Sequence, residues 1–181
     1  MSAFVGGGGD WQLVAATKNN AEFWMSRWEV TEQNAPDRRI WSVTYGCVGK
    51  SGHGVNVPIP ASNAAAERLL GALDAARTFA IQMNLQSWAD QFQQAIDCCD
   101  ATNAISFPDY VNLVCLDSYP ELSQRLFAAA YKGWVFGGMG SWNDQYFESE
   151  PDNTQFNSLS AELYAAINNG IQQATWSFGT K

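Results

Sequence analysis

The spacing of apolar residues changes once along this 181-residue chain, near residue 60, and that change constrains the fold more than any other feature. Before residue 60, apolar side chains alternate at period two, which is typical of strands with one buried face. After it, they recur at three- and four-residue steps, which is typical of amphipathic helices. We therefore predict an α+β fold, in which an N-terminal antiparallel β-meander of three or four strands is followed by about five helices.

The first third of the chain predicts the strands. An apolar run covers residues 11–16, and two later segments each place aromatic and β-branched side chains on one face. These side chains are Trp24, Trp28 and Val30 in the first segment, and Trp41, Val43 and Tyr45 in the second. A helix over Ala21–Arg27 competes with the first of these strands. A glycine-rich loop is expected over 46–54, before a last short alternation at 55–59.

Helices are predicted from residue 62 onward. The first begins at a Ser62 or Asn63 cap, the second covers 85–99, and a third starts at 106–109. The fourth begins with the capping box 118–121 (Ser-Tyr-Pro-Glu) and ends at Gly133, and the last covers 158–175. The expected inward side chains are Leu69, Leu70, Leu73, Ala76, Ala80 and Met83 in the first helix, Leu85, Trp88, Phe92, Ala95, Ile96 and Cys99 in the second, and Leu159, Leu163, Ala166, Ile167, Gly170 and Ala174 in the last.

A single domain, residues 1–181, accounts for the whole chain in this interpretation. Residues 1–9, with four consecutive glycines, form a flexible lead-in; residues 10–60 are the strand-rich part and 61–181 the helical part. The sequence has no segment of the signal-peptide or membrane-spanning type. Its four cysteines are expected to be reduced and mostly buried. The predicted location is therefore the cytoplasm.

The net charge of −8 is concentrated in one half of the chain. Residues 1–89 hold seven acidic and seven basic side chains, whereas residues 90–162 hold eleven acidic side chains against Arg125 and Lys132. This distribution argues against a nucleic-acid partner, whose phosphates need a basic surface. It favours a protein partner with a basic surface. The alternative is that the acidic groups only keep the domain soluble.

The chain lacks a complete set of catalytic or metal-binding residues. Its single histidine, His53, lies in the expected glycine-rich loop, and no nucleophile-elbow motif occurs. Cys98 and Cys99 end an amphipathic helix, where packing explains them better than a thiol dyad with His53. One histidine and four dispersed cysteines do not give zinc spacing. We therefore predict no enzyme activity, no metal and no cofactor, although a site built from paired carboxylates stays open.

The segment 134–144 is the most distinctive part of the sequence. Its glycines allow a tight connection after the fourth helix, namely Gly137, Gly138 and Gly140. Asn143 or Asp144 is then expected to bond to nearby backbone N–H groups, as in an Asx turn or a helix cap. A phosphate site is disfavoured, because no Lys or Arg follows the glycines and carboxylates do. The residues themselves thus predict a structural turn.

This segment also carries a resemblance. Phe136-Gly137-Gly138-Met139-Gly140-Ser141, with Asn143-Asp144, is similar to the FGGMGS-x-ND element of a group of small bacterial proteins of unknown function. Members of that group resemble immunity proteins paired with polymorphic or contact-delivered toxins. The likeness covers residues 65–147, and Trp142 replaces the smaller apolar residue that is usual there. The resemblance carries over no catalytic signature; it implies binding and neutralising of a cognate toxin, such as a secretion-system effector.

The residues that follow this loop are the predicted contact surface. Four carboxylates within nine residues, with no base between them, suit the Lys and Arg side chains of a basic toxin active site. Neighbouring aromatic residues, including Phe147 and Phe156, suit the buried anchors of a binding hot spot. The candidate contact residues are Trp142, Asp144, Tyr146, Glu148, Glu150 and Asp152. The alternative is a solvated acidic loop over an aromatic core cluster.

Two other functions stay open at this point. One is a small enzyme with a carboxylate-based site in the acidic half of the chain. The other is an adaptor or chaperone that binds a secreted effector through a tryptophan-rich sheet. The chain contains eight tryptophans, each a large apolar body with one N–H to satisfy.

Overall fold

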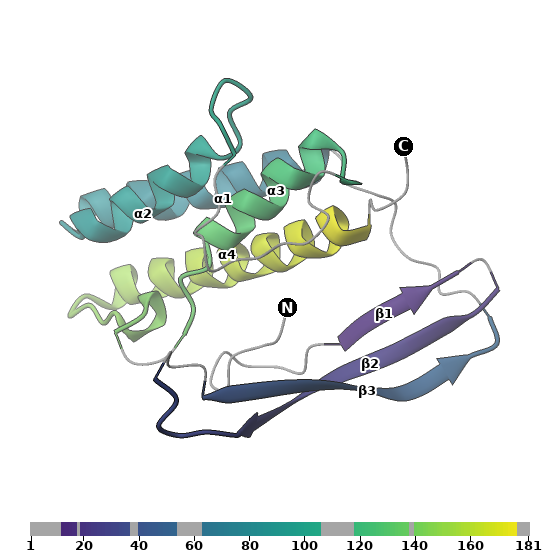
Figure 1. Cartoon of the computed structure of the whole chain (residues 1–181). Coiled ribbons are helices and arrows are strands. Elements are labelled where there is room, and N and C mark those ends of the chain that lie inside the picture. The colour runs from purple at the N-terminus through teal and green to yellow at the C-terminus, as the bar shows by residue number, and fades with distance from the viewer. Residues whose placement is uncertain are drawn as a thin grey trace. The chain divides into compact units, whose positions relative to one another are not determined.

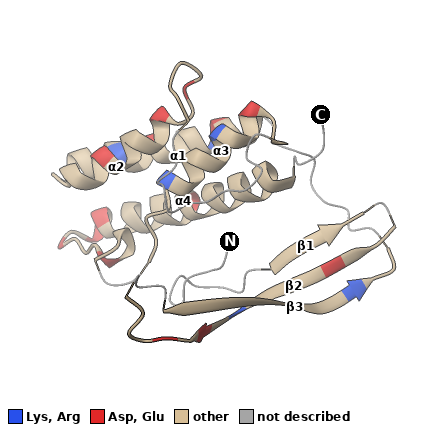
Figure 2. Ribbon diagram, in the orientation of Figure 1, with Lys and Arg blue, Asp and Glu red and all other residues tan. Residues whose placement is uncertain are grey.

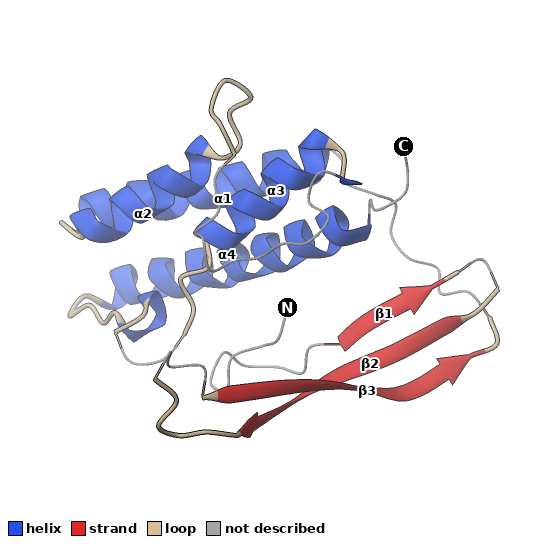
Figure 3. Cartoon of the chain, in the orientation of Figure 1, coloured by secondary structure: helices blue, strands red, loops and turns tan. Residues whose placement is uncertain are grey.

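A computed structural model describes residues 12–17, 19–36, 40–53, 63–105, 118–137 and 140–176. The chain divides into two compact units, Met1–Val57 and Pro58–Lys181. In the described residues all strands lie in the first unit and all helices in the second (Figures 1 and 3). This confirms the predicted α+β class, with three strands and four α-helices. None of the described helices is both long and apolar enough to cross a membrane.

The first unit is a three-stranded antiparallel sheet in the order β1-β2-β3. Its strands are β1 (Gln12–Ala16), β2 (Ala21–Val30) and β3 (Trp41–Ser51). The predicted meander is confirmed, and the competing helix over Ala21–Arg27 is wrong, because that segment pairs as a strand on both sides. The register sets Trp28 opposite Val43 and Val30 opposite Trp41. The two expected apolar sets therefore share one face of the sheet, where the rings of Trp28 and Trp41 lie edge-to-face at 6.3 Å.

Strand β3 extends through much of the expected glycine-rich loop. Residues 46–51 continue to pair with β2, so the expectation of a loop from 46 is wrong. The register shifts at one point: Phe23 pairs with Gly49 while Trp24 pairs with Cys47, which leaves Val48 as an extra residue. Glycine weakens the interior of a strand. Here Gly46 and Gly49, on either side of the bulge, pair with Met25 and Phe23 of β2. The expected alternation at 55–59 lies outside the described residues.

The second unit is built from α1 (Asn63–Gln82), α2 (Gln86–Asp97), α3 (Glu121–Lys132) and α4 (Glu150–Trp176). Their apolar faces meet in one core, as the three- and four-residue spacing predicted. Leu70 is an exception, since it is exposed on α1. Helix α4 passes close to its neighbours at Gly170, where a Cβ atom would lie 3.2 Å from Leu126 Cδ1 and 3.5 Å from Leu69 Cδ2.

The ends of two helices differ from the predictions. Helix α3 begins at Glu121 after Pro120, with no side-chain cap, so the capping box at Ser118 is wrong. Helix α4 begins at Glu150, eight residues before the predicted start at Ser158. Its first two turns carry few apolar residues, and Pro151 is tolerated there because the first N–H groups of a helix have no partner within it. The helix expected to start at 106–109 lies outside the described residues.

Helix α3 ends at Gly133 as predicted, but for a different reason. Gly133 has φ −78°, which any residue adopts. A Cβ atom at this position would lie 2.8 Å from Leu73 Cδ2 and 3.0 Å from the Ala129 carbonyl oxygen. The glycine is therefore required by close packing at the end of the helix, not by backbone conformation.

Candidate functional site

The segment 134–144 folds back onto the helical core after α3. The backbone N–H of Trp142 donates to the Val135 carbonyl at 3.0 Å, which closes the segment into a loop. Trp134 and Phe136 lie against Tyr164 of α4, with ring centroids 5.9 and 5.2 Å away. The loop is thus attached to the core at its beginning and at its end.

Asp144 and Asn143 hold the turn of this loop. Gly140 has φ +86°, a conformation that favours glycine. Its N–H and that of Ser141 donate to Asp144 Oδ2, at 2.6 and 3.1 Å. Asn143 Oδ1 accepts from the Ser141 hydroxyl at 2.6 Å. Of the two candidates, Asp144 thus makes the expected bonds to backbone N–H groups. These contacts stabilise the short 3₁₀ helix Trp142–Asp144.

Three of the predicted loop glycines have different environments. Gly140 needs its positive φ. Gly137 has no positive φ, and its N–H lies 3.4 Å from Asn143 Oδ1. Gly138 lies outside the described residues.

Trp142 is the centre of the aromatic core and not part of a contact surface. Its side chain is fully buried, with ring centroids 5.0 Å from those of Phe92 and Phe156. Its indole N–H donates to the Ser160 hydroxyl of α4 at 2.8 Å, so the one polar atom of the ring is satisfied. The prediction that Trp142 contacts a partner is therefore wrong. Phe156, expected as a second anchor, is also buried.

The connection between the 3₁₀ helix and α4 is fixed at both ends. The Phe147 N–H donates to Asn153 Oδ1 at 3.0 Å, and the Asn153 amide donates to the carbonyls of Phe147 and Ser149. The Phe147 ring packs on Phe79 at 5.3 Å. Tyr146 lies between the buried Trp142 and this attachment of Phe147, and it points outward, with 81% of its surface exposed. An aromatic side chain is thus presented to solvent on a backbone that is already ordered.

Unpaired carboxylates follow Tyr146. Glu148 and Glu150 are exposed and Asp152 is partly exposed. Glu150 and Asp152 lie in the first turn of α4, where negative charge is favourable at the positive end of the helix dipole. None of the ion pairs among the described residues involves these three side chains.

The three arginines of the helical unit are engaged in ion pairs elsewhere. In residues 63–176, the described part holds eleven acidic and four basic side chains. Acidic side chains are spread over its helices and loops (Figure 2). Arg68 binds Glu162, Arg77 binds Asp74, and Arg125 binds Glu121. Arg125 also donates to three backbone carbonyls just after α2. The negative charge at 148–152 is therefore not offset locally.

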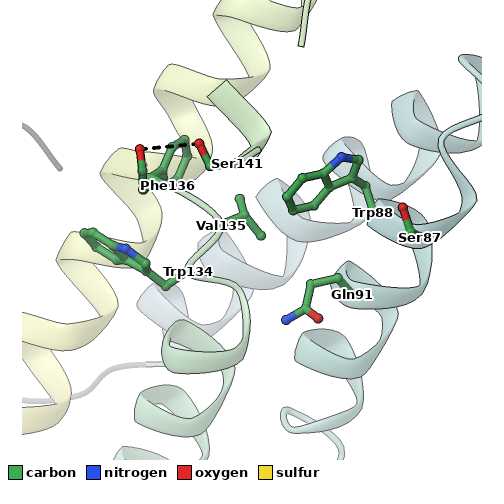
Figure 4. A pocket seen from close by; sticks show the side chains of 8 residues that line it. Ser87, Trp88, Gln91, Trp134, Val135, Phe136 and Ser141 are labelled. Carbon is green, nitrogen blue, oxygen red and sulfur yellow. Dashed lines mark hydrogen bonds between the residues drawn. The ribbon is translucent and has the colours of Figure 1, made fainter. Parts of the chain in front are cut away.

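A pocket of about 410 Å³ that is open to the surface, called the cavity below, lies between the start of α2 and the loop segment (Figure 4). Trp88 comes from α2, and Trp134 and Phe136 come from the loop segment. The amide of Gln91 donates to the Lys132 carbonyl oxygen at 2.6 Å, at the end of α3. The remaining lining residues are Ser87, Val135, Gly137 and Ser141. Sequence patterns do not reveal this cavity, because Trp88 fits the core stripe of its helix and Trp134 lies 46 residues later.

The candidate catalytic side chains belong to two different units of the chain. His53 is exposed in the sheet unit. Cys98 and Cys99 lie at the end of α2, and burial raises the pKa of both thiols, that of Cys99 to about 11. At neutral pH these thiols are protonated and poor nucleophiles. No group of three His, Cys, Asp or Glu side chains in the described part of the chain is arranged to hold a metal ion.

No family model, curated protein or solved structure matches the chain. Functional inference therefore depends on the residues and their geometry.

Proposed function

We propose that this protein binds and neutralises a cognate bacterial toxin with a basic surface, in the cytoplasm, and acts by binding and not by catalysis. The observation that carries the proposal is Tyr146, which is 81% exposed on an ordered backbone. Tyrosine is enriched in binding hot spots, because a large amphipathic ring gives much contact area at small entropic cost. The backbone on either side is fixed by the contacts of Asn153 and Trp142. Binding at Tyr146 therefore costs little conformational entropy of the backbone.

Three carboxylates give this contact its charge preference. Glu148, Glu150 and Asp152 follow Tyr146 without ion pairs in the described residues. Carboxylates of this kind attract Lys and Arg side chains and accelerate association at low salt. A toxin that acts on nucleic acid has such basic side chains in its active site. Residues Tyr146–Asp152 are hereafter called the acidic edge.

The resemblance of Phe136–Asp144 to the FGGMGS-x-ND element supports the same proposal. In this chain the element is the support of the acidic edge: it buries Trp142 and holds the turn through Asp144. This differs from the contact predicted from the sequence, because Trp142 and Asp144 now have structural roles. The proposed contact consists of Tyr146, Glu148, Glu150 and Asp152.

Growth rescue tests the proposal. The toxin-like product of a neighbouring gene is expressed with this protein or with its variant Glu148→Lys, which changes a residue outside α4. Rescue by the native protein and weaker rescue by the variant are expected. The matched control is Asp90→Lys, which makes the same charge change on the exposed face of α2. Failure of the native protein to rescue, with both proteins soluble, contradicts the proposal.

A second candidate function is favoured by the sheet. Its aromatic face includes Val30 and Trp41, which are 51% and 47% exposed and lie opposite each other. Exposed apolar side chains on a sheet suit an adaptor that binds an effector protein through this face. If the protein is such an adaptor, Trp41→Ser is expected to abolish effector binding. If it neutralises a toxin through the acidic edge, the same variant is expected to neutralise the toxin as well as the native protein does.

A further inference from the structure

The cavity between α2 and the loop segment combines aromatic walls with hydrogen-bond acceptors. Trp88, Trp134 and Phe136 provide the aromatic surface (Figure 4). Its volume of about 410 Å³ lies at the small end of the range of ligand sites. The described residues that line it include no Lys, Arg, Asp or Glu. Its aromatic rings favour an occupant with a flat face that can lie against them.

The polar atoms available in the cavity accept hydrogen bonds. A carbonyl oxygen only accepts, so the contact between Gln91 and the Lys132 carbonyl uses the Gln91 NH₂ group and leaves its Oε1 as the available end. The Ser141 hydroxyl donates its proton to Asn143 Oδ1 at 2.6 Å and accepts the Asp144 backbone N–H, which leaves one lone pair of its oxygen. The Gly137 carbonyl oxygen, 3.4 Å from Ser141 Oγ, is a further acceptor.

The charge of the surrounding unit favours a cation. The described residues 63–176 hold seven more acidic than basic side chains. The cavity also adjoins the end of α3, the negative end of its dipole, through Gln91 and the Lys132 carbonyl. Ser87 is the second residue of α2, and the N-terminus of a helix is the positive end of its dipole. An anionic occupant is therefore the alternative to a cation.

We propose that this cavity receives an arginine side chain of a protein partner. The guanidinium group is planar, weakly hydrated and carries five N–H donors and no acceptor, which matches aromatic rings together with Gln91 Oε1, Ser141 Oγ and the Gly137 carbonyl. Stacking of arginine on tryptophan adds a cation–π contribution. The inference rests on the proposed function only in that the partner is a basic protein.

Binding of a small probe tests this site without the toxin. The probe is N-acetyl-arginine amide, followed by heteronuclear NMR of the indole N–H signals. The expected result is a saturable shift at the indoles of Trp88 and Trp134. N-acetyl-citrulline amide, which is neutral and similar in shape, and N-acetyl-lysine amide are expected to bind at least about tenfold more weakly, because they lose the charge or the planar fork.

Two variants with the same added charge separate the cavity from general electrostatics. Ser87→Lys places an amine at the cavity and is expected to abolish probe binding. Gln94→Lys adds the same charge at an exposed position of α2 outside the cavity and is expected to retain most of it. Trp134→Phe keeps a ring in place and is expected to weaken binding less than Trp134→Ala. Unchanged melting temperatures show that each variant is folded.

Several results overturn the inference. For the probes, these are binding of the citrulline amide as tight as that of the arginine amide, tighter binding of N-acetyl-glutamate amide, or no shift at the two indoles. For the variants, it is an equal loss of probe binding in Ser87→Lys and Gln94→Lys. The proposed function is tested separately: toxin rescue without arginine binding rejects the cavity alone. Arginine binding without toxin rescue rejects the proposed function alone.

Discussion

The two halves of the predicted contact surface are held differently in the structure. In the first half Trp142 is fully buried, and the exposed Asp144 accepts two backbone N–H groups. Only a few residues later, Tyr146 and Glu148 point to solvent. Both halves contain an aromatic side chain and acidic side chains, so residue type does not separate them. The halves differ in their packing and hydrogen bonds. The first half supports the loop through Trp142 and Asp144, and the second half is left for contact with a partner.

The largest expected difference between the halves is in stability. Trp142→Ala removes a fully buried indole and its hydrogen bond to Ser160, and we expect it to lower the free energy of unfolding of the helical unit by about 3–5 kcal/mol. Tyr146→Ala removes an exposed ring and is expected to change it by less than about 0.5 kcal/mol. Urea denaturation followed by helical circular dichroism measures both. Equal losses of unfolding free energy in the two variants contradict the conclusion that Trp142 is buried and Tyr146 exposed.

The next largest effect on stability is expected at Gly133, which is closely packed just before the segment 134–144. Gly133→Ala brings a Cβ atom to within 2.8 Å of Leu73 Cδ2 and is expected to cost about 1–3 kcal/mol. Gly71→Ala is the matched control, because nothing lies within 4 Å of the added Cβ in α1. This change is expected to stabilise the protein by about 0.4–1 kcal/mol. Thermal melts of both variants that shift in the same direction count against the packing explanation for Gly133.

A carboxylate in each half gives a smaller contrast. Asp144→Ala leaves the N–H groups of Gly140 and Ser141 without their acceptor and is expected to cost about 0.5–2 kcal/mol. Glu148→Ala has no such partner to lose and is expected to be neutral in stability. Melting temperatures at neutral pH compare them. A destabilised Glu148→Ala shows that the acidic edge also has a structural role.

The smallest effect is expected at Glu162, an acidic residue of α4 that does have an ion pair. The hydrogen bond from Arg68 lowers the pKa of Glu162 below 4.5, so the pair stabilises the fold above that pH and the contribution is lost as pH falls through the lowered pKa. Because both side chains are about half exposed, Glu162→Gln is expected to cost at most about 1 kcal/mol at pH 7. In melts of the two proteins the difference is expected to shrink as the pH falls below 4.5. A cost that does not change with pH argues against the ion pair.

Much of the fold could be predicted because its signals are local. Alternation in 41–45 predicts a strand, and the spacing of Leu69, Leu73 and Ala76 predicts a helix. The missed parts depend on distant partners. Residues 46–51 look like a loop, but β2 supplies the hydrogen bonds that make them a strand. The start of α4 was missed because residues 150–157 have only Phe156 as an inward apolar side chain.

The site was less predictable for the same physical reason. The role of Asp144 follows from its own turn and was expected from the sequence. The burial of Trp142 depends on Ser160, Phe92 and Phe156, which lie in other helices. The cavity depends on residues of α2 and of the loop segment, which only the packing of the helices brings together. No local pattern contains this information.

The most direct test of the account is the affinity of Tyr146→Ala for the cognate toxin, measured by calorimetry with the melting temperature of the variant as its control. We expect an affinity at least about 30-fold lower, as for a hot-spot aromatic residue, together with an unchanged melting temperature. Unchanged affinity of a folded Tyr146→Ala variant would contradict the claim that the acidic edge is the contact surface.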